Sequence, residues 1–150
     1  MDMNLKIVPG SALPKVSTDL TGRTVLVTGA NTGLGYAAAL KFLRMNPARL
    51  VLAVRDVSKG LEAARRLTDD LGAGAEAGDG DGGGALPSPV HAGALEGVVQ
   101  VWECDLASFA SVTRFVQRVD EELERLDVAV LNAAVATSKW ATTADAWEVS

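Results

Sequence analysis

The 150-residue sequence predicts an α/β fold with a doubly wound parallel sheet that stops after about four strands. Two observations support this prediction. Short apolar runs without polar alternation recur along the chain, as expected for strands that are buried on both faces. Segments with helical apolar spacing separate these runs, and a helix is the usual connection between two parallel strands. Strand and helix therefore alternate in the order β-α-β-α-β-α-β, which is typical of a sheet with helices on both faces.

The first elements follow a polar, proline-punctuated lead-in segment over residues 1–21. Residues 23–28 (RTVLVT) are β-branched and apolar, and Gly29 stops this first strand. A helix is expected over residues 33–45, because apolar side chains recur there at helical spacing and an Asn-Pro pair follows. The run LVLAV at residues 50–54 predicts a second strand.

The later elements continue the same alternation. Asp56 or Ser58 is placed to cap a second helix that runs to about residue 71, and residues 98–103 predict a third strand. Ser108 is then expected to cap a third helix with one apolar face, which comprises Phe109, Val112, Val116, Val119, Leu123 and Leu126. A fourth strand follows at residues 128–131, and Thr143 is in position to cap one more helix.

A glycine-rich segment interrupts the pattern at residues 72–97. It holds nine of the 15 glycines, four acidic residues and no Lys or Arg. Such a composition buries too little apolar area to offset the entropy of ordering, so we interpret it as a disordered insertion. A phosphate-binding loop is the alternative, but no strand leads into this segment and no Lys-Ser/Thr pair follows it. The chain thus divides into the lead-in over residues 1–21 and one partial domain over residues 22–150, which contains this insertion.

Composition excludes several classes of function. The net charge is −5 and aromatic residues make up 5% of the chain, which argues against nucleic-acid partners. The single cysteine, Cys104, excludes an intramolecular disulfide and any multi-cysteine metal site, so no metal is expected. The sequence has no run of ~18 apolar residues, so it predicts no membrane span. We therefore expect a soluble protein located in the cytoplasm.

The most informative segment is Thr28-Gly29-Ala30-Asn31-Thr32-Gly33-Leu34-Gly35, here called the glycine turn. It follows a predicted strand and opens a predicted helix, which is the context that a dinucleotide-binding motif requires. Gly29 allows a sharp turn, Gly33 allows the backbone to approach a pyrophosphate, and Gly35 allows the helix to pack on the strand. The helix N-terminus supplies amide donors and a favourable dipole for phosphates.

This spacing, a Thr followed by G-x-x-x-G-x-G, resembles the short-chain dehydrogenase/reductase family. Two further matches occur in the family's order: Asp105-Leu106 after the third strand, and Leu131-Asn132-Ala133-Ala134, which is similar to the family's N-N-A-G. Ala134 departs from that pattern, since glycine is usual there. The segments NTGLG and LAVRD resemble sequences of the retinol-dehydrogenase-like branch and its fungal relatives, some of which work in secondary metabolism. The resemblance covers roughly residues 20–150 and corresponds to the family's N-terminal half.

The resemblance implies a Rossmann-type fold, a nicotinamide cofactor and hydride transfer to or from a carbonyl or alcohol of a small organic molecule. The glycines would form the pyrophosphate turn, Asp105 would meet the adenine, and Asn132 would line the ribose side. The cofactor-binding residues that it implies are Thr28, Gly29, Asn31, Gly33, Leu34, Gly35, Arg55, Asp105, Leu106 and Asn132.

Arg55 bears on the choice of cofactor. A carboxylate about 20 residues beyond the glycine motif binds the ribose 2′-hydroxyl of NAD. Here that position holds Arg55, whose planar guanidinium suits a 2′-phosphate, while the adjacent Asp56 is better placed as a helix cap. The sequence therefore favours NADP(H) over NAD(H), with an ordinary surface arginine as the alternative.

The family's catalytic Ser and Tyr-x-x-x-Lys do not occur in this sequence. The only tyrosine, Tyr36, lies in the first predicted helix, and the residue four positions later is leucine. No catalytic residue is therefore assigned. The alternative to an active oxidoreductase is an inactive, truncated NADP-binding module or one half of a split enzyme. A methyltransferase on a similar sheet is a third hypothesis, and it is disfavoured because its glycine turn normally lacks this spacing. The open edge of the fourth strand predicts a homo-oligomer or a partner chain that covers it.

Overall fold

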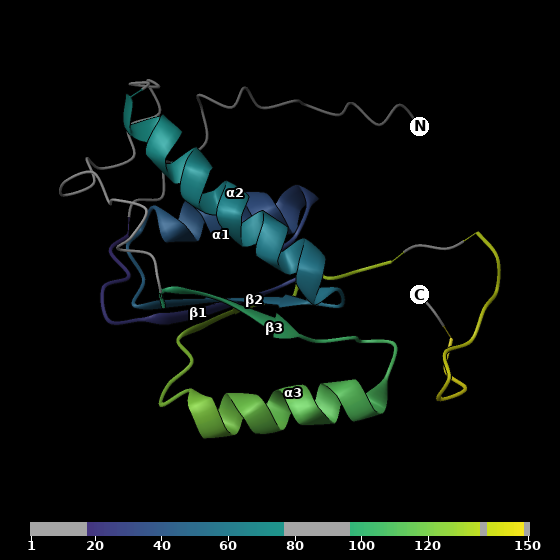
Figure 1. Cartoon of the computed structure of the whole chain (residues 1–150). Coiled ribbons are helices and arrows are strands. Elements are labelled where there is room, and N and C mark those ends of the chain that lie inside the picture. Colours follow the sequence, from purple (N-terminus) through teal and green to yellow (C-terminus); the bar gives the residue numbers. More distant parts are fainter. Residues whose placement is uncertain (1–17, 77–96, 136–137, 149–150) are drawn as a thin grey trace, which may run out of the picture.

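Four parallel strands form one sheet in the order β3-β2-β1-β4 (Figure 1). The strands are β1 (Thr24–Thr28), β2 (Arg49–Val54), β3 (Val99–Glu103) and β4 (Val128–Val130). The computed structural model describes residues 18–76, 97–135 and 138–148. The order of the strands reverses beside β1, because the chain builds outward through β2 and β3 and then returns to pair β4 with β1. This reversal creates a topological switch point between the carboxyl ends of β1 and β4.

Helices cover both faces of the sheet. Helices α1 (Gly33–Leu43) and α2 (Val57–Glu76) lie side by side on one face, and α3 (Phe109–Glu122) lies on the other (Figure 1). The predicted fold class, a doubly wound parallel sheet of Rossmann type, is therefore confirmed, and its four strands all occur within two residues of the expected positions.

The central strands are apolar on both faces because each face has its own core. All five residues of β1 are buried, as are the last five of β2. Toward α1 and α2, strand side chains such as Val25 and Leu52 pack with Leu43 and Leu67. Toward α3, the core is built around Trp102, whose side chain is 1% exposed. Burying side chains of this kind contributes roughly 1.5–3 kcal/mol each, so the two cores hold the sheet between its helices.

Ordered residues lie on the far side of both predicted boundaries, and the division into domains stays a prediction. Leu20 was expected in the lead-in segment, but it is buried in the α1–α2 core, and its N–H donates to the Met45 carbonyl at 2.7 Å. Helix α2 runs on to Glu76, so residues 72–76 of the expected insertion are helical. The two alanines of this segment favour a helix and its two glycines oppose one, so propensity alone does not set where α2 ends. Residues 77–96 of the expected insertion lie outside the described residues, and its last residue, Gly97, is in a turn.

Only part of the apolar face that the spacing predicts for α3 packs against the sheet. Phe109, Val116 and Leu126 are between 41% and 51% exposed, whereas Phe115, Val119 and Leu123 pack against the sheet. The Phe115 ring meets the Trp102 indole edge-on, with ring centroids 6.1 Å apart. This aromatic contact turns the helix so that only part of the expected apolar face is buried. The predicted cap is confirmed, because the Ser108 hydroxyl accepts the Ser111 N–H.

The helix expected after Thr143 is wrong for the residues that the structure describes up to Glu148. Thr142 and Glu148 form an antiparallel bridge instead, and the Thr143 N–H donates to the Trp147 carbonyl at 2.7 Å. Ala146 has a positive φ of 61°, which closes the turn. This turn is held against α3, because the Asp145 carboxylate accepts the Phe109 N–H at 2.7 Å.

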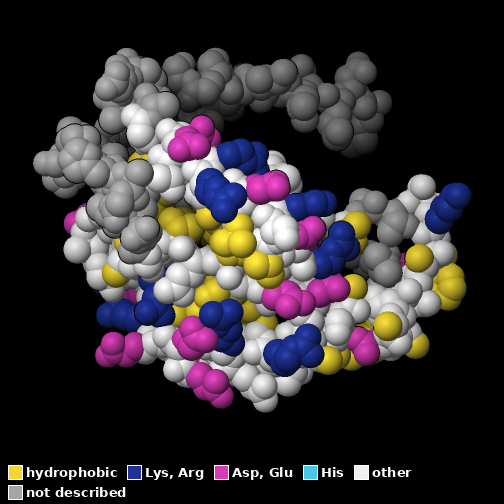
Figure 2. Space-filling model, in the orientation of Figure 1, with side chains coloured by type: hydrophobic (Ala, Val, Ile, Leu, Met, Phe, Trp, Pro, Cys, Tyr) yellow, Lys and Arg dark blue, Asp and Glu magenta, His cyan; other side chains and the backbone are white. Residues whose placement is uncertain are grey.

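The surface carries no concentrated charge on the face shown in Figure 2. Lys and Arg side chains lie among Asp and Glu side chains over α2 and α3 there, rather than gathering into one basic patch. Among the described helices, none is long and apolar enough to cross a bilayer.

Candidate functional site

The carboxyl ends of β1 and β4 meet at the switch point and are tied together by Thr28 and Asn132. The Thr28 hydroxyl accepts the N–H groups of Asn132 and Ala133, both at 2.9 Å. The Asn132 side-chain amide donates to the Thr28 carbonyl at 3.1 Å. In open α/β sheets, ligands bind in the crevice outside the strand ends at such a point. Thr28 and Asn132 therefore fix the floor of the candidate site by joining its two walls.

The glycine turn has the close packing that its spacing predicts. Gly29 adopts a positive φ of 64°, and its N–H donates to the Ala53 carbonyl on β2 at 2.8 Å. A Cβ atom at Gly35 would lie 2.4 Å from the Gly29 carbonyl oxygen and 2.5 Å from the Asn132 side-chain nitrogen. No side chain fits there, so Gly35 lets α1 approach the ends of β1 and β4. The turn and Asn132 thus form one packed unit.

The remaining glycine of the turn faces open space. Gly33 has a φ of 56°, and a Cβ atom placed on it would meet nothing within 4 Å. Helix α1 begins at this residue, and its Thr32 N-cap makes no side-chain hydrogen bond to the first turn, which carries no acidic residue. The first N–H groups of a helix and its positive dipole end attract anions. The arrangement therefore fits the pyrophosphate of a dinucleotide, with the Leu34 side chain, 83% exposed, beside it.

Arg55 and Asp56 follow β2 and have different surroundings. The Asp56 carboxylate accepts the Lys59 N–H at 3.2 Å, which caps α2 as expected. The Arg55 side chain is exposed, and it makes no hydrogen bond or ion pair with the described residues. A guanidinium in that position has its donors available for an anion.

Asp105 and Leu106 lie where β3 leads into α3. One Asp105 carboxylate oxygen accepts the Ala107 N–H at 3.0 Å, and the Asp105 N–H donates to the Ser111 hydroxyl at 3.0 Å. The carboxylate therefore shapes the loop and leaves its second oxygen for a ligand. Leu106 is half exposed. Cys104, which directly precedes Asp105, is buried, and this burial raises the pKa of its thiol.

The structure thus places the predicted residues at consecutive strand ends along one edge of the sheet: the glycine turn after β1, Arg55 after β2, Asp105 and Leu106 after β3, and Asn132 after β4. Contact of these residues with a cofactor stays a prediction. Within the described residues, no group of three or more His, Cys, Asp or Glu side chains is arranged to hold a metal ion.

Sequence reasoning missed Arg66, which lies on α2 and contacts the glycine turn. Its guanidinium donates to the Asn31 carbonyl at 2.9 Å and lies 4.8 Å from the centre of the Tyr36 ring. The sequence offers one indication of its position: Arg66 is next to Leu67, which follows Ala63 by one helical turn, and both apolar residues are buried. That spacing puts Arg66 at the margin of the packed face, but it does not identify the turn as its partner.

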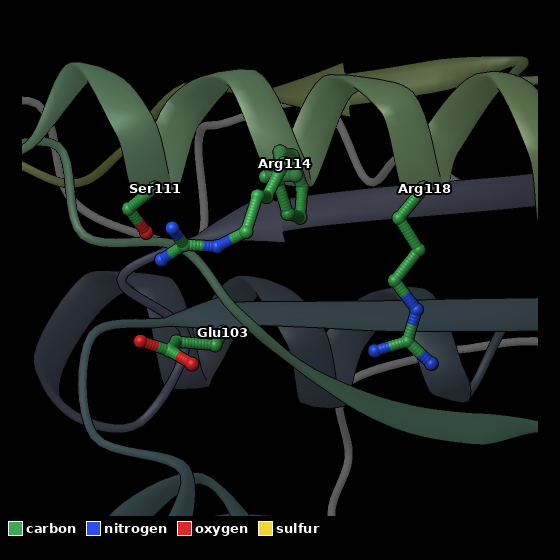
Figure 3. Close-up of a pocket in the computed structure, with 5 residues that line it drawn as sticks. Glu103, Ser111, Arg114 and Arg118 are labelled. Carbon is green, nitrogen blue, oxygen red and sulfur yellow. The ribbon is translucent and has the colours of Figure 1, made fainter.

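A separate cavity of about 160 Å³ lies between β3 and α3 (Figure 3). Figure 3 shows the Arg114 side chain extending toward Ser111 and Glu103, with Arg118 farther along the helix. The Arg118 guanidinium pairs with Glu122 at 2.7 Å and lies over the Trp102 ring. Small-molecule sites usually span roughly 300–1,000 Å³, so this cavity is too small for a dinucleotide. It includes none of the predicted site residues.

Comparison with known proteins finds similar sequences and folds. A short chain dehydrogenase of Arthrobotrys oligospora is 39% identical over 132 residues, which cover 88% of this chain and 35% of that protein. Retinol dehydrogenase 14 of Homo sapiens is 40% identical over 128 residues, which cover 85% of this chain and 35% of that protein. A metagenomic short-chain oxidoreductase solved in complex with NADP has a TM-score of 0.54 and 29% identity, covering 77% of this chain and 41% of that one.

The similarity covers most of this chain but only part of each relative. The chain spans about a third of the length of the curated relatives that it matches. No protein-family model matches it.

Proposed function

This chain is a homologue of the short-chain dehydrogenases and matches about the N-terminal third of their length, and on that basis we propose that it binds NADP(H). The proposed activity of the whole protein is hydride transfer between NADP(H) and a carbonyl or alcohol of a small organic molecule. The nicotinamide would carry the hydride, and the residues of this chain would bind and orient the cofactor.

One observation supports nucleotide binding above the others. Gly33 lies at the uncapped N-terminus of α1 with open space where a side chain would stand, at the switch point of the sheet. The backbone N–H groups there would bind the pyrophosphate, and Asn132 would line the ribose side. Asp105 and Leu106 would border the adenine.

NADP(H) is the preferred cofactor because of Arg55. NAD-specific sites place a carboxylate near the ribose 2′-hydroxyl, whereas this position holds an exposed guanidinium. The only adjacent carboxylate, Asp56, accepts a hydrogen bond from the start of α2. The similar metagenomic oxidoreductase was solved with NADP, which agrees with this choice.

The binding test compares NADPH and NADH by isothermal titration calorimetry on the 150-residue chain and its Arg55→Ala variant. We expect NADPH to bind the native sequence more tightly. Arg55→Ala lowers NADPH affinity about tenfold or more and leaves NADH affinity unchanged, because only NADPH has the 2′-phosphate. Arg65→Ala, which removes an exposed guanidinium from α2, is the matched control. Equal loss for both cofactors, or no loss, contradicts the assignment of Arg55.

A second candidate function is cofactor binding without turnover by this chain alone. These 150 residues contain no Tyr-x-x-x-Lys, and the hydroxyl of the single tyrosine, Tyr36, donates a hydrogen bond to Asp70 at 2.7 Å between α1 and α2. We expect no oxidation of NADPH when the chain is mixed with a panel of aldehydes and ketones. Turnover by the chain alone refutes this second candidate, and binding of S-adenosylmethionine in place of NADPH refutes both.

The edge of β4 is the proposed place for a partner. Among the described strands β4 pairs with β1 only, and the Leu131 side chain that follows it is 84% exposed. A second copy or another chain would cover this edge, and sedimentation velocity measures the assembly. A cytoplasmic location and a role in secondary metabolism stay predictions.

A further inference from the structure

Arg66 connects α2 to the glycine turn through a hydrogen bond and a cation–π contact. Its guanidinium donates to the Asn31 carbonyl oxygen at 2.9 Å, and its Cζ atom lies 4.8 Å from the centre of the Tyr36 ring. Tyr36 is on α1, so the same side chain contacts both the turn and the helix that follows it. Both contacts favour one orientation of the Arg66 side chain.

The ring that supports Arg66 is itself held in place. The Tyr36 hydroxyl donates to the Asp70 carboxylate at 2.7 Å, and Asp70 is one helical turn beyond Arg66 on α2. Partial burial and this hydrogen bond raise the pKa of Tyr36 to about 12, so the phenol stays neutral and donating at ordinary pH. Arg66, Tyr36 and Asp70 thus form a fixed brace between α1 and α2, here called the turn brace.

Holding the Asn31 carbonyl also orients the next amide. In a trans peptide the C=O and the following N–H point in opposite directions, and the described residues contain no cis bonds. The Thr32 N–H therefore points away from α2 while the Asn31 carbonyl points toward Arg66. Thr32 is the N-cap of α1, immediately before Gly33, so this peptide belongs to the segment expected to receive the pyrophosphate.

We propose that Arg66 is a positioning residue for the dinucleotide, which fixes the Asn31–Thr32 peptide in the orientation that binds the cofactor. The inference rests on the proposed function. A pre-organised turn loses less conformational entropy on binding than a free one, so Arg66 increases affinity without touching the ligand. Because the pyrophosphate is common to both nicotinamide cofactors, Arg66 acts on NADPH and NADH alike.

The test compares Arg66→Met with Arg65→Met, which removes the same charge from the neighbouring exposed position on α2. Arg66→Met weakens NADPH and NADH binding equally, by about threefold to tenfold, the effect of one net hydrogen bond. Arg65→Met leaves both affinities unchanged. A loss confined to NADPH identifies Arg66 as a direct phosphate ligand and overturns the proposal, as does a loss no larger than that of Arg65→Met.

Hydrogen–deuterium exchange gives a readout that needs no cofactor. Arg66→Met speeds exchange in the peptide that spans residues 30–34 and leaves β2 unchanged, at an unaltered melting temperature. Tyr36→Leu produces the same local change, whereas Tyr36→Phe, which keeps the ring under the guanidinium but loses the hydrogen bond to Asp70, produces a smaller one. Unchanged exchange at the turn in both Arg66→Met and Tyr36→Leu overturns the proposal. Native chain that binds neither cofactor refutes the proposed function, whatever the exchange shows.

Discussion

Replacing Gly35 with alanine tests the packing at the centre of the candidate site. The added Cβ would lie 2.4 Å from the Gly29 carbonyl oxygen and 2.5 Å from the Asn132 side-chain nitrogen. Ordinary contact begins near 3.4 Å, so α1 must move by about 1 Å from the ends of β1 and β4. The carbonyl belongs to the backbone and cannot rotate away. The substitution therefore separates the helix N-terminus from the crevice.

The expected cost follows from two opposing effects. Overpacking of this kind costs roughly 1–3 kcal/mol, and the upper end applies because two close contacts form at once. Alanine recovers up to about 1 kcal/mol through its better helix propensity. The free energy of unfolding therefore falls by about 2 kcal/mol, and the melting temperature falls by roughly 10 °C. Chemical denaturation measures the first quantity, and calorimetric titration measures the accompanying loss of NADPH binding.

Two other glycines in helices provide the controls. A Cβ at Gly72 on α2 would meet nothing within 4 Å, so Gly72→Ala leaves binding intact and stabilises the chain by up to about 1 kcal/mol. A Cβ at Gly60 would lie 2.4 Å from the Val101 side chain, so Gly60→Ala destabilises the fold away from the site. Close packing at Gly35 is contradicted if Gly35→Ala is as stable as Gly72→Ala and binds NADPH as the native sequence does.

Three further predictions follow from individual side chains. Thr28→Val removes the acceptor of the Asn132 and Ala133 N–H groups and lowers the free energy of unfolding, measured by denaturation, by about 1–3 kcal/mol, whereas Thr28→Ser does not. Equal stability of the two variants contradicts this prediction. Hydrogen bonds from Arg125 and the Thr24 N–H hold the pKa of Asp127 well below its ordinary 3.8. The contribution of Asp127 to stability is therefore complete above pH 3.8 and is lost as the pH falls below that value. Asp127→Asn reduces this dependence of stability on pH, and an identical acid profile for the variant contradicts the prediction. Burial and the hydrogen bond to Asp70 raise the pKa of Tyr36 to about 12, so its contribution to stability is complete below pH 10 and is lost between pH 10 and 12. Ultraviolet titration of this single tyrosine measures its pKa, and an ordinary midpoint contradicts the prediction.

Local chemistry made the glycine turn predictable. Its glycines lie between a β-branched run and a helical pattern, and the positive φ at Gly29 and Gly33 is a property of the backbone that few other residues adopt. Capping by Asp56 and Ser108 was predictable for the same reason, because a cap depends only on the next three residues. Most of the candidate site could therefore be predicted, because its residues lie directly after the predicted strands.

Tertiary contacts decided what the sequence could not predict. The spacing in α3 allows two overlapping apolar faces, and the edge-on contact of Phe115 with Trp102 selects the one that is packed. Thr143 has the chemistry of a cap, but the hydrogen bond from the Phe109 N–H to Asp145 holds that segment as a turn against α3. Arg66 lies 35 residues from Asn31, and only the packing of α2 on α1 brings them together.

The most direct test of nucleotide binding at the sheet edge is amide chemical-shift mapping of the ¹⁵N-labelled chain during titration with NADPH. We expect saturable shifts confined to residues 29–35, to Arg55, to residues 105–106 and to Asn132, four segments joined only by the carboxyl edge of the sheet. Shifts of the same size with NADH at Arg55 would contradict the choice of NADP(H). Shifts confined to the cavity around Arg114 and Arg118, or none at all, would contradict the site itself.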